Sequence, residues 1–319
     1  TQSTHKAHTK HTHTHTHTVA HSSHAVAIPF LGLPRSGGLE GERVWEQALS
    51  GHELAFLRDH RVGTVPLLPG TCYIEMARAV VQASDAQPPS GGGHGGVAAF
   101  ALTSVAFSTI LFLDEDEATP TLRVALGTDE SGVRLIAITS HHGDGASDTH
   151  GTMALELRTE EAASHLDVAA ASAEGSSSGE RVAAAAFYLA CGNDYQGEFR
   201  AMEWATAIKP NGGEILSKVS YPHTEVHRVH LRSCAWLDTC LHAPYWWAEH
   251  RSRPFYIASV RSYWIRSMDA SRNRTMWSLM QGLGGQGDLQ PDVLRYHSDE
   301  GRRRDGSQQE ARCRVQIDG

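Results

Sequence analysis

The sequence predicts an α+β fold in which two halves of the chain share one architecture. Each half contains a series of strand-like runs that read as antiparallel, together with one helix whose apolar residues indicate burial. Residues 158–180 are rich in Ser, Ala and Glu and poor in large apolar side chains, so they separate the halves. No sequence repeat relates the two halves, and their similarity is one of architecture.

The chain is therefore divided into four parts. We expect a low-complexity, disordered tail over residues 1–40, a first half over 41–160, a linker over 161–180 and a second half over 181–319. The tail contains the tract HTHTHTHT at 11–18, which could chelate metal loosely or have no specific role. Because residues 1–28 offer so little to bury, we leave them out of the fold.

The first half combines strands with a helix that follows a proline. Strands are expected at 43–50 and 54–62. Pro69 suits the first turn of a helix over 70–84, because its missing N–H costs nothing there. Apolar residues of this helix recur at the spacing of one helical face, at Tyr73, Met76, Ala77 and Val80. After a flexible loop at 86–96, further strand-like runs cover 97–113, 121–127, 133–139 and 150–157.

The second half is organised in a similar way. It begins with a helix over 180–192, and a second helical piece covers 233–250. Strand-like runs cover 199–208, 214–222 and 255–267. Two later runs, 274–283 and 312–319, could close the sheet.

Composition excludes several classes of protein. Hydrophobic residues make up 40% of the 319, which suffices for a real core, and the net charge of −8 argues against a nucleic-acid binder. The basic run Arg302-Arg303-Arg304 is too short to change this, and no apolar run reaches the roughly 18 residues of a membrane span. Five scattered cysteines without a CxxC pair argue against a cysteine-based zinc site and predict an intracellular, cytoplasmic setting.

His60 is the first candidate for chemistry. It lies in RDHRVGTVPLLPGTCYIEMARAV at 58–80, at the expected end of a strand and just before the helix that follows Pro69. A lone histidine beside apolar strands is often a hydrogen-bonded core residue. Here, however, unpaired N–H groups at the helix start could bind an oxygen that gains negative charge. His60 is therefore a candidate general base.

Asp238 is the second candidate. It lies in the mostly apolar helix CAWLDTCLHAP at 234–244, and His242 follows four residues later on the same helical face. One interpretation is an Asp–His pair on the surface. The alternative is a buried carboxyl group, which would have a raised pKa and could act as a general acid.

The third candidate stretch is GNDYQGEFRAMEW at 192–204. Two glycines bracket Tyr195, and Phe199 and Trp204 follow as apolar anchors. Taken alone, the stretch predicts a helix end, a turn and the start of a strand, with Tyr195 either in the core or in a site.

Together these stretches resemble the dehydratase domain of polyketide synthases and its relative in animal fatty acid synthase. The family motif HxxxGxxxxP is matched by His60 and Pro69, although its glycine position holds Thr64 and the glycine is Gly63. The family motif GxxYGPxF is matched by Tyr195 and Phe199 in GNDYQGEF, without the proline. The family motif DxxxQ/H is matched by DTCLH at 238–242, and the three motifs occur in the family's order.

The resemblance implies a double hotdog fold, in which two antiparallel sheets are each wrapped around a long helix. The helices would be 69–84 and 233–247, and the active site would lie between the halves. It further implies that His60 removes an α-proton and that Asp238 protonates a departing β-hydroxyl. His242 would orient Asp238, Tyr195 would position the leaving group, and the Thr64 N–H with the helix start after Pro69 would hold a thioester oxygen.

The activity implied is that of a 3-hydroxyacyl-[acyl carrier protein] dehydratase, a hydro-lyase of polyketide or fatty acid synthesis. No cofactor and no metal are implied, since the substrate is a thioester tethered to the phosphopantetheine of an acyl carrier protein. Other synthase domains are implied as partners, a homodimer is compatible with the resemblance, and nucleic acid and membrane are not implied. One alternative keeps the same fold but changes the reaction: a product-template cyclase acting on a poly-β-ketone. Another is of a different class: a non-catalytic module that binds acyl chains or dimerises a synthase.

Overall fold

The computed structural model describes most of both halves of the chain. The residues it describes are 30–36, 38, 41–50, 52–84, 99–113, 120–141, 146–158, 181–208, 214–220, 226–247, 252, 254, 259–265, 275–281, 293–298 and 310–316. The predictions for the histidine–threonine tract, the loop at 86–96, the linker at 161–180 and the arginine run lie outside these residues.

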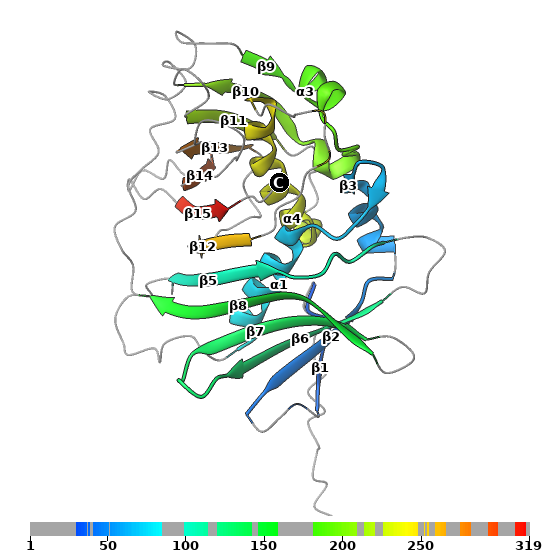
Figure 1. Cartoon of the computed structure of the whole chain (residues 1–319), viewed down its shortest axis with the longest axis vertical. Helices are drawn as coiled ribbons and strands as arrows, with labels where there is room; N and C mark the ends of the chain where they lie inside the picture. The colour runs from blue at the N-terminus through cyan, green and yellow to red at the C-terminus, as the bar shows by residue number, and fades with distance from the viewer. Residues whose placement is uncertain are drawn as a thin grey trace, which may run out of the picture.

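Among the described residues, thirteen strands form one antiparallel sheet, in the order β1-β2-β6-β7-β8-β5-β12-β15-β14-β13-β11-β10-β9 (Figure 1). The strands of the first half are β1 (Leu33–Arg35), β2 (Arg43–Ala48), β5 (Ala99–Phe107), β6 (Thr121–Thr128), β7 (Arg134–His141) and β8 (Ser147–Arg158). Those of the second half are β9 (Arg181–Ala183), β10 (Met202–Ala207), β11 (Glu214–Ser220), β12 (Ser259–Ile265), β13 (Thr275–Gln281), β14 (Val293–Ser298) and β15 (Glu310–Gln316). A separate hairpin pairs β3 (Arg61–Val62) with β4 (Val65–Pro66).

The sheets of the two halves are joined edge to edge. Strand β5 of the first half pairs with β12 of the second, with Val105 opposite Val260 and Leu102 opposite Tyr263. The prediction of two separate sheets is therefore modified: each half forms its own set of strands, and the hydrogen bonds between β5 and β12 make one continuous sheet. An edge strand has unpaired N–H and C=O groups, and this pairing satisfies them for both halves.

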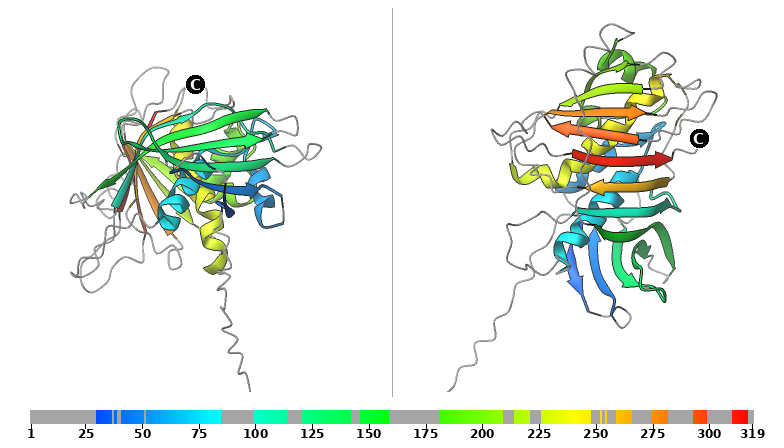
Figure 2. Two further views of the ribbon diagram at one scale, coloured as in Figure 1. Left: turned by 90° about the horizontal axis from the view of Figure 1, so that it is seen from below. Right: turned by 90° about the vertical axis from the view of Figure 1, so that its left-hand side faces the viewer.

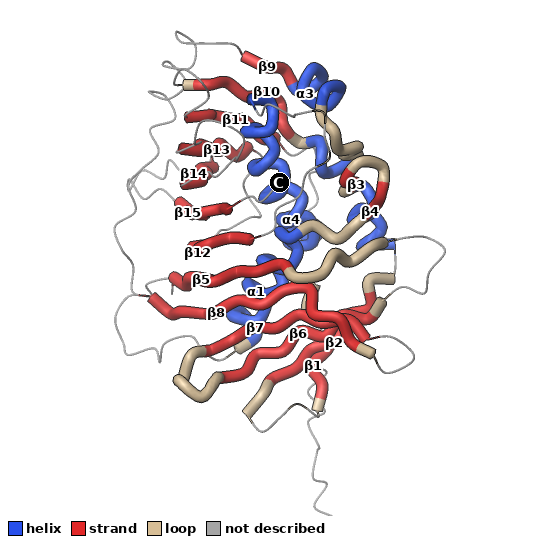
Figure 3. The backbone as a smooth tube through the Cα atoms, viewed as in Figure 1, coloured by secondary structure: helices blue, strands red, loops and turns tan. Residues whose placement is uncertain are grey.

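Two long helices lie against one face of this curved sheet (Figures 1 and 2). They are α1 (Gly70–Ala83) in the first half and α4 (Val226–His242) in the second, and they contact each other. The remaining helical elements are short: η1 (His52–Asp59), α3 (Ala184–Ala190), η2 (Gly197–Arg200) and η4 (Ala243–Trp247). Of these, η1 contacts β4 and η2, whereas α3 lies beside β9 and β10 at the far end of the sheet (Figure 3).

Helix α1 is buried on all its faces over residues 71–80, including two charged side chains. Burying a charge is costly unless the charge is paired, and here Glu75 and Arg78 pair with each other through Arg78 Nη2 and Glu75 Oε2, 2.6 Å apart. The Ser233 hydroxyl of α4 donates to Glu75 Oε2 over 2.7 Å. The polar contact thus links the central helices of the two halves inside one continuous core.

Several local predictions were wrong. Residues 54–62 do not form one strand; Leu54 and Leu57 are buried on η1, where residues three apart lie on the same face. The helix predicted over 180–192 is divided into β9 and α3. The tail predicted to reach residue 40 ends earlier, because β1 pairs with β2, and Phe30 and Leu31 are buried.

The prediction for the helix over 70–84 is confirmed almost to the residue, as are the strands at 43–50, 121–127 and 214–222 to within one or two residues. Strand β14 was missed. In the described part of the chain, none of the helices has both the length and the apolar composition needed to cross a membrane.

Candidate active site

His60 lies between η1 and β3 and is buried. The hairpin formed by β3 and β4 folds the chain back on itself, so that the Leu67 N–H donates to the His60 carbonyl over 3.1 Å. The same return brings the Leu67 carbonyl to 2.9 Å from His60 Nδ1. The predicted position at the end of a strand is therefore wrong, and the hairpin is what positions the ring.

These contacts define the chemical state of His60. A carbonyl oxygen can only accept a hydrogen bond, so Nδ1 carries the proton and Nε2 of the neutral ring presents a lone pair. Burial lowers the pKa of His60, against the opposing effects of the Asp238 carboxylate and the Leu67 carbonyl. A neutral imidazole with a free Nε2 is the form that a general base requires.

Asp238 faces His60 from helix α4. The Asp238 Oδ2 atom lies 3.6 Å from His60 Nε2 and 2.8 Å from His242 Nε2, and all three side chains are buried. His242 is one helical turn after Asp238, which is the spacing that brings two side chains of a helix together. The Asp–His pair is thus buried, and its surface interpretation is wrong.

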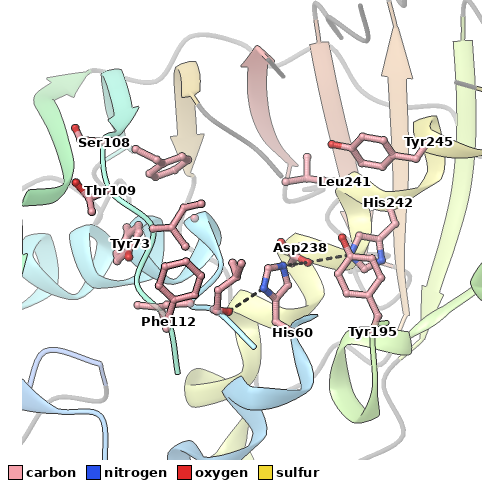
Figure 4. A pocket seen from close by; sticks show the side chains of 15 residues that line it. His60, Tyr73, Ser108, Thr109, Phe112, Tyr195, Asp238, Leu241, His242 and Tyr245 are labelled. Carbon is pink, nitrogen blue, oxygen red and sulfur yellow. Dashed lines mark hydrogen bonds and ion pairs between the residues drawn. The ribbon is translucent and has the colours of Figure 1, made fainter. Parts of the chain in front are cut away.

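Tyr195 completes the group from the segment between α3 and η2. Its ring stacks on the His242 imidazole, with 3.9 Å between centroids and 21° between planes, and lies 5.5 Å from the His60 ring. Phe199 packs against His60, with 5.2 Å between the centroids of the two rings. Figure 4 shows His60, Asp238, His242 and Tyr195 converging from three separate segments.

These four residues line one cavity of about 390 Å³. Its walls are mainly apolar, and its other lining residues are Leu67, Leu68, Gly70, Tyr73, Phe107, Ser108, Thr109, Ile110, Phe112, Leu241 and Tyr245. Phe112 and Ile110 are partly exposed, so the cavity reaches the surface along the loop after β5. The polar group lies at one end, and the apolar walls extend away from it (Figure 4).

The start of helix α1 borders the cavity at Gly70. Pro69 is the N-cap residue and has no side-chain capping bond, so the first-turn N–H groups are not capped by it. A Cβ atom at position 70 would lie 2.6 Å from the Phe107 ring, which explains the need for glycine there. Pro69 itself fixes the helix start without lining the cavity.

Thr64 and Gly63 lie away from the cavity. They form the turn between β3 and β4, where Gly63 has a left-handed backbone with φ of +59° and Thr64 is exposed. Neither residue lines the cavity, so the expected contact of the Thr64 N–H with a thioester oxygen is not supported by its position. The tight turn directs this segment outward. Gly70 at the start of α1, and not Thr64, lies beside the candidate catalytic residues.

Asn193, a buried residue beside the site, was not predicted from the sequence. Its side chain hydrogen-bonds both Gly63 of the hairpin and Tyr195. No pattern of residue types around position 193 indicates these contacts, because the hairpin and the tyrosine segment meet only in the folded chain. Among the described residues, no group of three or more His, Cys, Asp or Glu side chains is arranged to hold a metal ion.

Taken together, the cavity holds a neutral base and a carboxyl group side by side at one end, facing a space that a substrate could enter. A helix start lies next to them and can stabilise an oxygen that gains negative charge. Such a set can remove one proton and deliver another within a single bound molecule.

Comparison with known proteins agrees with this picture. Residues 29–141 match the family model of the polyketide synthase dehydratase domain. No curated protein sequence matches the chain at a significant level.

Solved structures match over nearly the whole chain. The dehydratase domain from the CurF module of curacin polyketide synthase has a TM-score of 0.72 and 17% identity, covering 92% of this chain and 100% of its own. A trans-AT polyketide synthase dehydratase domain from Brevibacillus brevis has a TM-score of 0.70 and 20% identity, covering 92% and 100%. CurK dehydratase of the curacin synthase matches with a TM-score of 0.71 and 16% identity, covering 91% and 96%.

Two of the CurK structures are described as inactive mutants, one with histidine replaced by phenylalanine and one with aspartate replaced by asparagine. The fold matches confirm the predicted double hotdog, and the match over residues 29–141 confirms the predicted resemblance to polyketide synthase dehydratase domains.

Proposed function

We propose that the chain is a polyketide synthase dehydratase domain that removes water from a 3-hydroxyacyl thioester and leaves a 2-enoyl thioester. The observation that carries this proposal is the placement of His60 Nε2 and Asp238 Oδ2, 3.6 Å apart at the end of one apolar cavity. The description of CurK mutants at a histidine and an aspartate as inactive supports the same pair of residue types.

In the proposed reaction, His60 Nε2 takes the proton from the α-carbon. The electrons of the broken C–H bond form the new double bond, and the bond between the β-carbon and its hydroxyl breaks. Protonated Asp238 gives its proton to the departing hydroxyl, which leaves as water. The site then holds imidazolium and carboxylate, and return of a proton from His60 to Asp238 restores the starting state. Each such proton transfer typically contributes roughly 10²–10⁴-fold to the rate.

The neighbours of these two residues support their roles. The bond from His60 Nδ1 to the Leu67 carbonyl holds the ring with Nε2 toward the cavity. The contact of His242 Nε2 with Asp238 Oδ2 holds the carboxyl group in place. The N-terminus of α1 at Gly70 would stabilise the thioester oxygen as the α-carbon loses its proton. Tyr195 would hold the leaving hydroxyl.

The substrate class follows from the cavity and the chemistry. The apolar walls suit an acyl chain, and the thioester acidifies the α-proton, so the proposed steps use no cofactor. We propose that the acyl chain is carried on the phosphopantetheine of an acyl carrier protein, and that this protein and other synthase domains are the partners. The pairing of base and acid in one cavity favours a dehydratase over a module that only binds acyl chains.

A direct test uses a 3-hydroxyacyl pantetheine thioester and follows water loss by mass spectrometry. We expect His60→Phe and Asp238→Asn each to lower kcat by about 10²–10⁴-fold, because each removes one proton-transfer group. His141→Phe, the same substitution at an exposed position on β7, is the matched control and should keep full activity. Unchanged turnover in both site variants would rule out the mechanism.

The same assay separates the alternative functions. A cyclase would leave the 3-hydroxyacyl thioester intact and convert a poly-β-ketone mimic into aromatic product. A non-catalytic module would bind the acyl carrier protein with no loss of water from its cargo.

A further inference from the structure

Asn193 connects the part of the site that carries His60 with the part that carries Tyr195. Its Oδ1 atom accepts a hydrogen bond from the Gly63 N–H over 3.2 Å. Its Nδ2 atom donates to the Tyr195 hydroxyl oxygen over 2.9 Å. Asn193 is 3% exposed, so both contacts are shielded from water.

The Gly63 contact decides which way round the Asn193 amide lies. A backbone N–H can only donate, so the amide atom that faces Gly63 must be the oxygen. The amide nitrogen must then face Tyr195 and donate to its hydroxyl oxygen. As a result, the Tyr195 oxygen acts as acceptor toward Asn193, and its hydrogen is directed to a different partner.

Two further backbone bonds hold this arrangement in register. The Asp194 N–H donates to the Gly63 carbonyl over 2.9 Å, and the Gln196 N–H donates to the Asp59 carbonyl over 2.9 Å. Both accepting carbonyls lie within three residues of His60. The segment 193–196 is therefore fixed against the loop that positions the base, and Asn193 adds a side-chain contact to this interface.

Tyr195 carries the effect into the centre of the site. Its ring stacks on His242, which contacts Asp238 Oδ2 at 2.8 Å. Burial and the nearby Asp238 carboxylate raise the pKa of Tyr195 well above its usual value, so its hydroxyl keeps its hydrogen. Tyr195 also lines the cavity beside Asp238, where the leaving hydroxyl of the substrate would lie.

From these contacts we infer that Asn193 is a positioning residue that makes the Tyr195 hydroxyl a hydrogen-bond donor toward the substrate. The Gly63 N–H fixes the orientation of the Asn193 amide, and the amide N–H in turn makes the Tyr195 oxygen an acceptor, so that the hydroxyl hydrogen points elsewhere. The role rests on the proposed dehydration, in which Tyr195 would donate to the oxygen of the departing β-hydroxyl and help to hold it near Asp238.

The decisive variant is Asn193→Asp, which keeps the shape and the acceptor toward Gly63 but reverses the contact with Tyr195. An ionised carboxylate can only accept, so Tyr195 would donate to the introduced carboxylate and lose its donor role toward substrate. We expect kcat to fall about 10-fold or more with little change in KM, since the lost hydrogen bond is made to an oxygen that gains negative charge only as the hydroxyl departs.

The pH profile supplies a readout that a purely structural role would not change. When the introduced carboxyl group is protonated it can again donate to Tyr195, so the ratio of kcat between Asn193→Asp and wild type should rise as the pH falls. Asp194→Asn, which exchanges the same two groups at the neighbouring exposed residue, is the matched control and should give a ratio near one at every pH.

A double-mutant cycle with Tyr195→Phe tests whether Asn193 acts through that hydroxyl. In the Tyr195→Phe protein, the Asn193→Asp change should lower kcat by less than about 2-fold, because the hydroxyl that it affects is already gone. An equal loss in both backgrounds, or unchanged kcat in Asn193→Asp, would overturn the inference. If Asn193→Asp fails to fold, Asn193→Ala completes the same cycle with the same criteria. Absence of turnover in the wild-type protein would instead refute the proposed function.

Discussion

At the scale of single residues, the site depends on His60 staying neutral beside the carboxyl group of Asp238. Burial lowers the pKa of His60 and Asp238 raises it, with burial the larger effect. The proton on Nδ1 is held by the Leu67 carbonyl, so protonation at lower pH occurs on Nε2, the atom that faces Asp238. The proposed base is thus lost when this atom gains a proton.

This balance gives a prediction for the titration of His60. We expect nuclear magnetic resonance of the His60 ring to give a pKa below 6.5, the ordinary value. In Asp238→Asn the pKa should fall further, because the carboxylate that favours the charged ring has been removed. A His60 pKa at or above 6.5 in the wild type, or a rise in the variant, would contradict the assignment.

The same shift affects stability in a definite direction. Above pH 6.5 the ring is neutral in both the folded and the unfolded chain and has no effect. Below pH 6.5 the unfolded chain binds a proton that the folded chain does not, so the free energy of unfolding falls toward the folded-state pKa. His60→Gln should lose less stability than wild type over that interval in urea titrations.

At the scale of elements, two glycines have left-handed backbones but different surroundings. Substituting each of them distinguishes the cost of backbone strain from the cost of packing. Gly197 at the start of η2 has φ of +45°, and a Cβ atom there would overlap the Asp59 carboxylate. Gly132, in the turn before β7, has φ of +85° with nothing within 4 Å of the added atom. The first position therefore carries a packing requirement that the second does not.

We expect Gly132→Ala to cost about 1 kcal/mol in the free energy of unfolding, from the left-handed backbone alone. Gly197→Ala should cost about 1–2 kcal/mol more, since Asp59 must move to admit the methyl group. Because Asp59 directly precedes His60, Gly197→Ala should also lower kcat, and Gly132→Ala should not. Denaturant unfolding and turnover measure both effects, and equal losses in the two variants would show that the Asp59 contact is unimportant.

The 58–80 stretch could be only partly predicted, because its elements differ in length and regularity. The apolar spacing of α1 is regular enough to place the helix almost to the residue. Residues 52–66, by contrast, form a 3-10 helix and a two-strand hairpin whose strands have two residues each. Such short elements are stabilised by tertiary contacts, and their sequence carries little periodic signal.

At the scale of the whole molecule, the two halves share one sheet and one core among the described residues. The sheet continues through β5 and β12, and one core of buried side chains extends through both halves. The buried Glu75–Arg78 pair, joined by Ser233, lies where α1 meets α4. The candidate active site lies at the same boundary, so its geometry depends on how the halves are held together.

We expect Arg78→Met to lower the free energy of unfolding by about 3–5 kcal/mol, because it leaves the buried Glu75 carboxylate without its cation. The double variant Glu75→Leu/Arg78→Met should be more stable than Arg78→Met alone, since the unpaired charge is gone. Arg35→Met, which breaks the exposed pair with Glu46, should cost less than about 1 kcal/mol. Similar losses for Arg78→Met and Arg35→Met in denaturant unfolding would argue against a buried ionic link.

The sequence by itself determined which residue types are available for the proposed chemistry and their order along the chain. Three spaced motifs named His60, Tyr195, Asp238 and His242, and apolar periodicity placed the helix over 70–84 that borders the site. These features are local, because residue type and spacing within one element decide them.

The tertiary structure alone decided how these residues meet. It joined two predicted sheets into one and brought His60 Nε2 to 3.6 Å from Asp238 Oδ2. It turned Thr64 away from the cavity through the left-handed Gly63 and placed Asn193 between Gly63 and Tyr195. Contacts between residues far apart in the chain depend on strand pairing and on packing of the whole core, and no local pattern of residues encodes them.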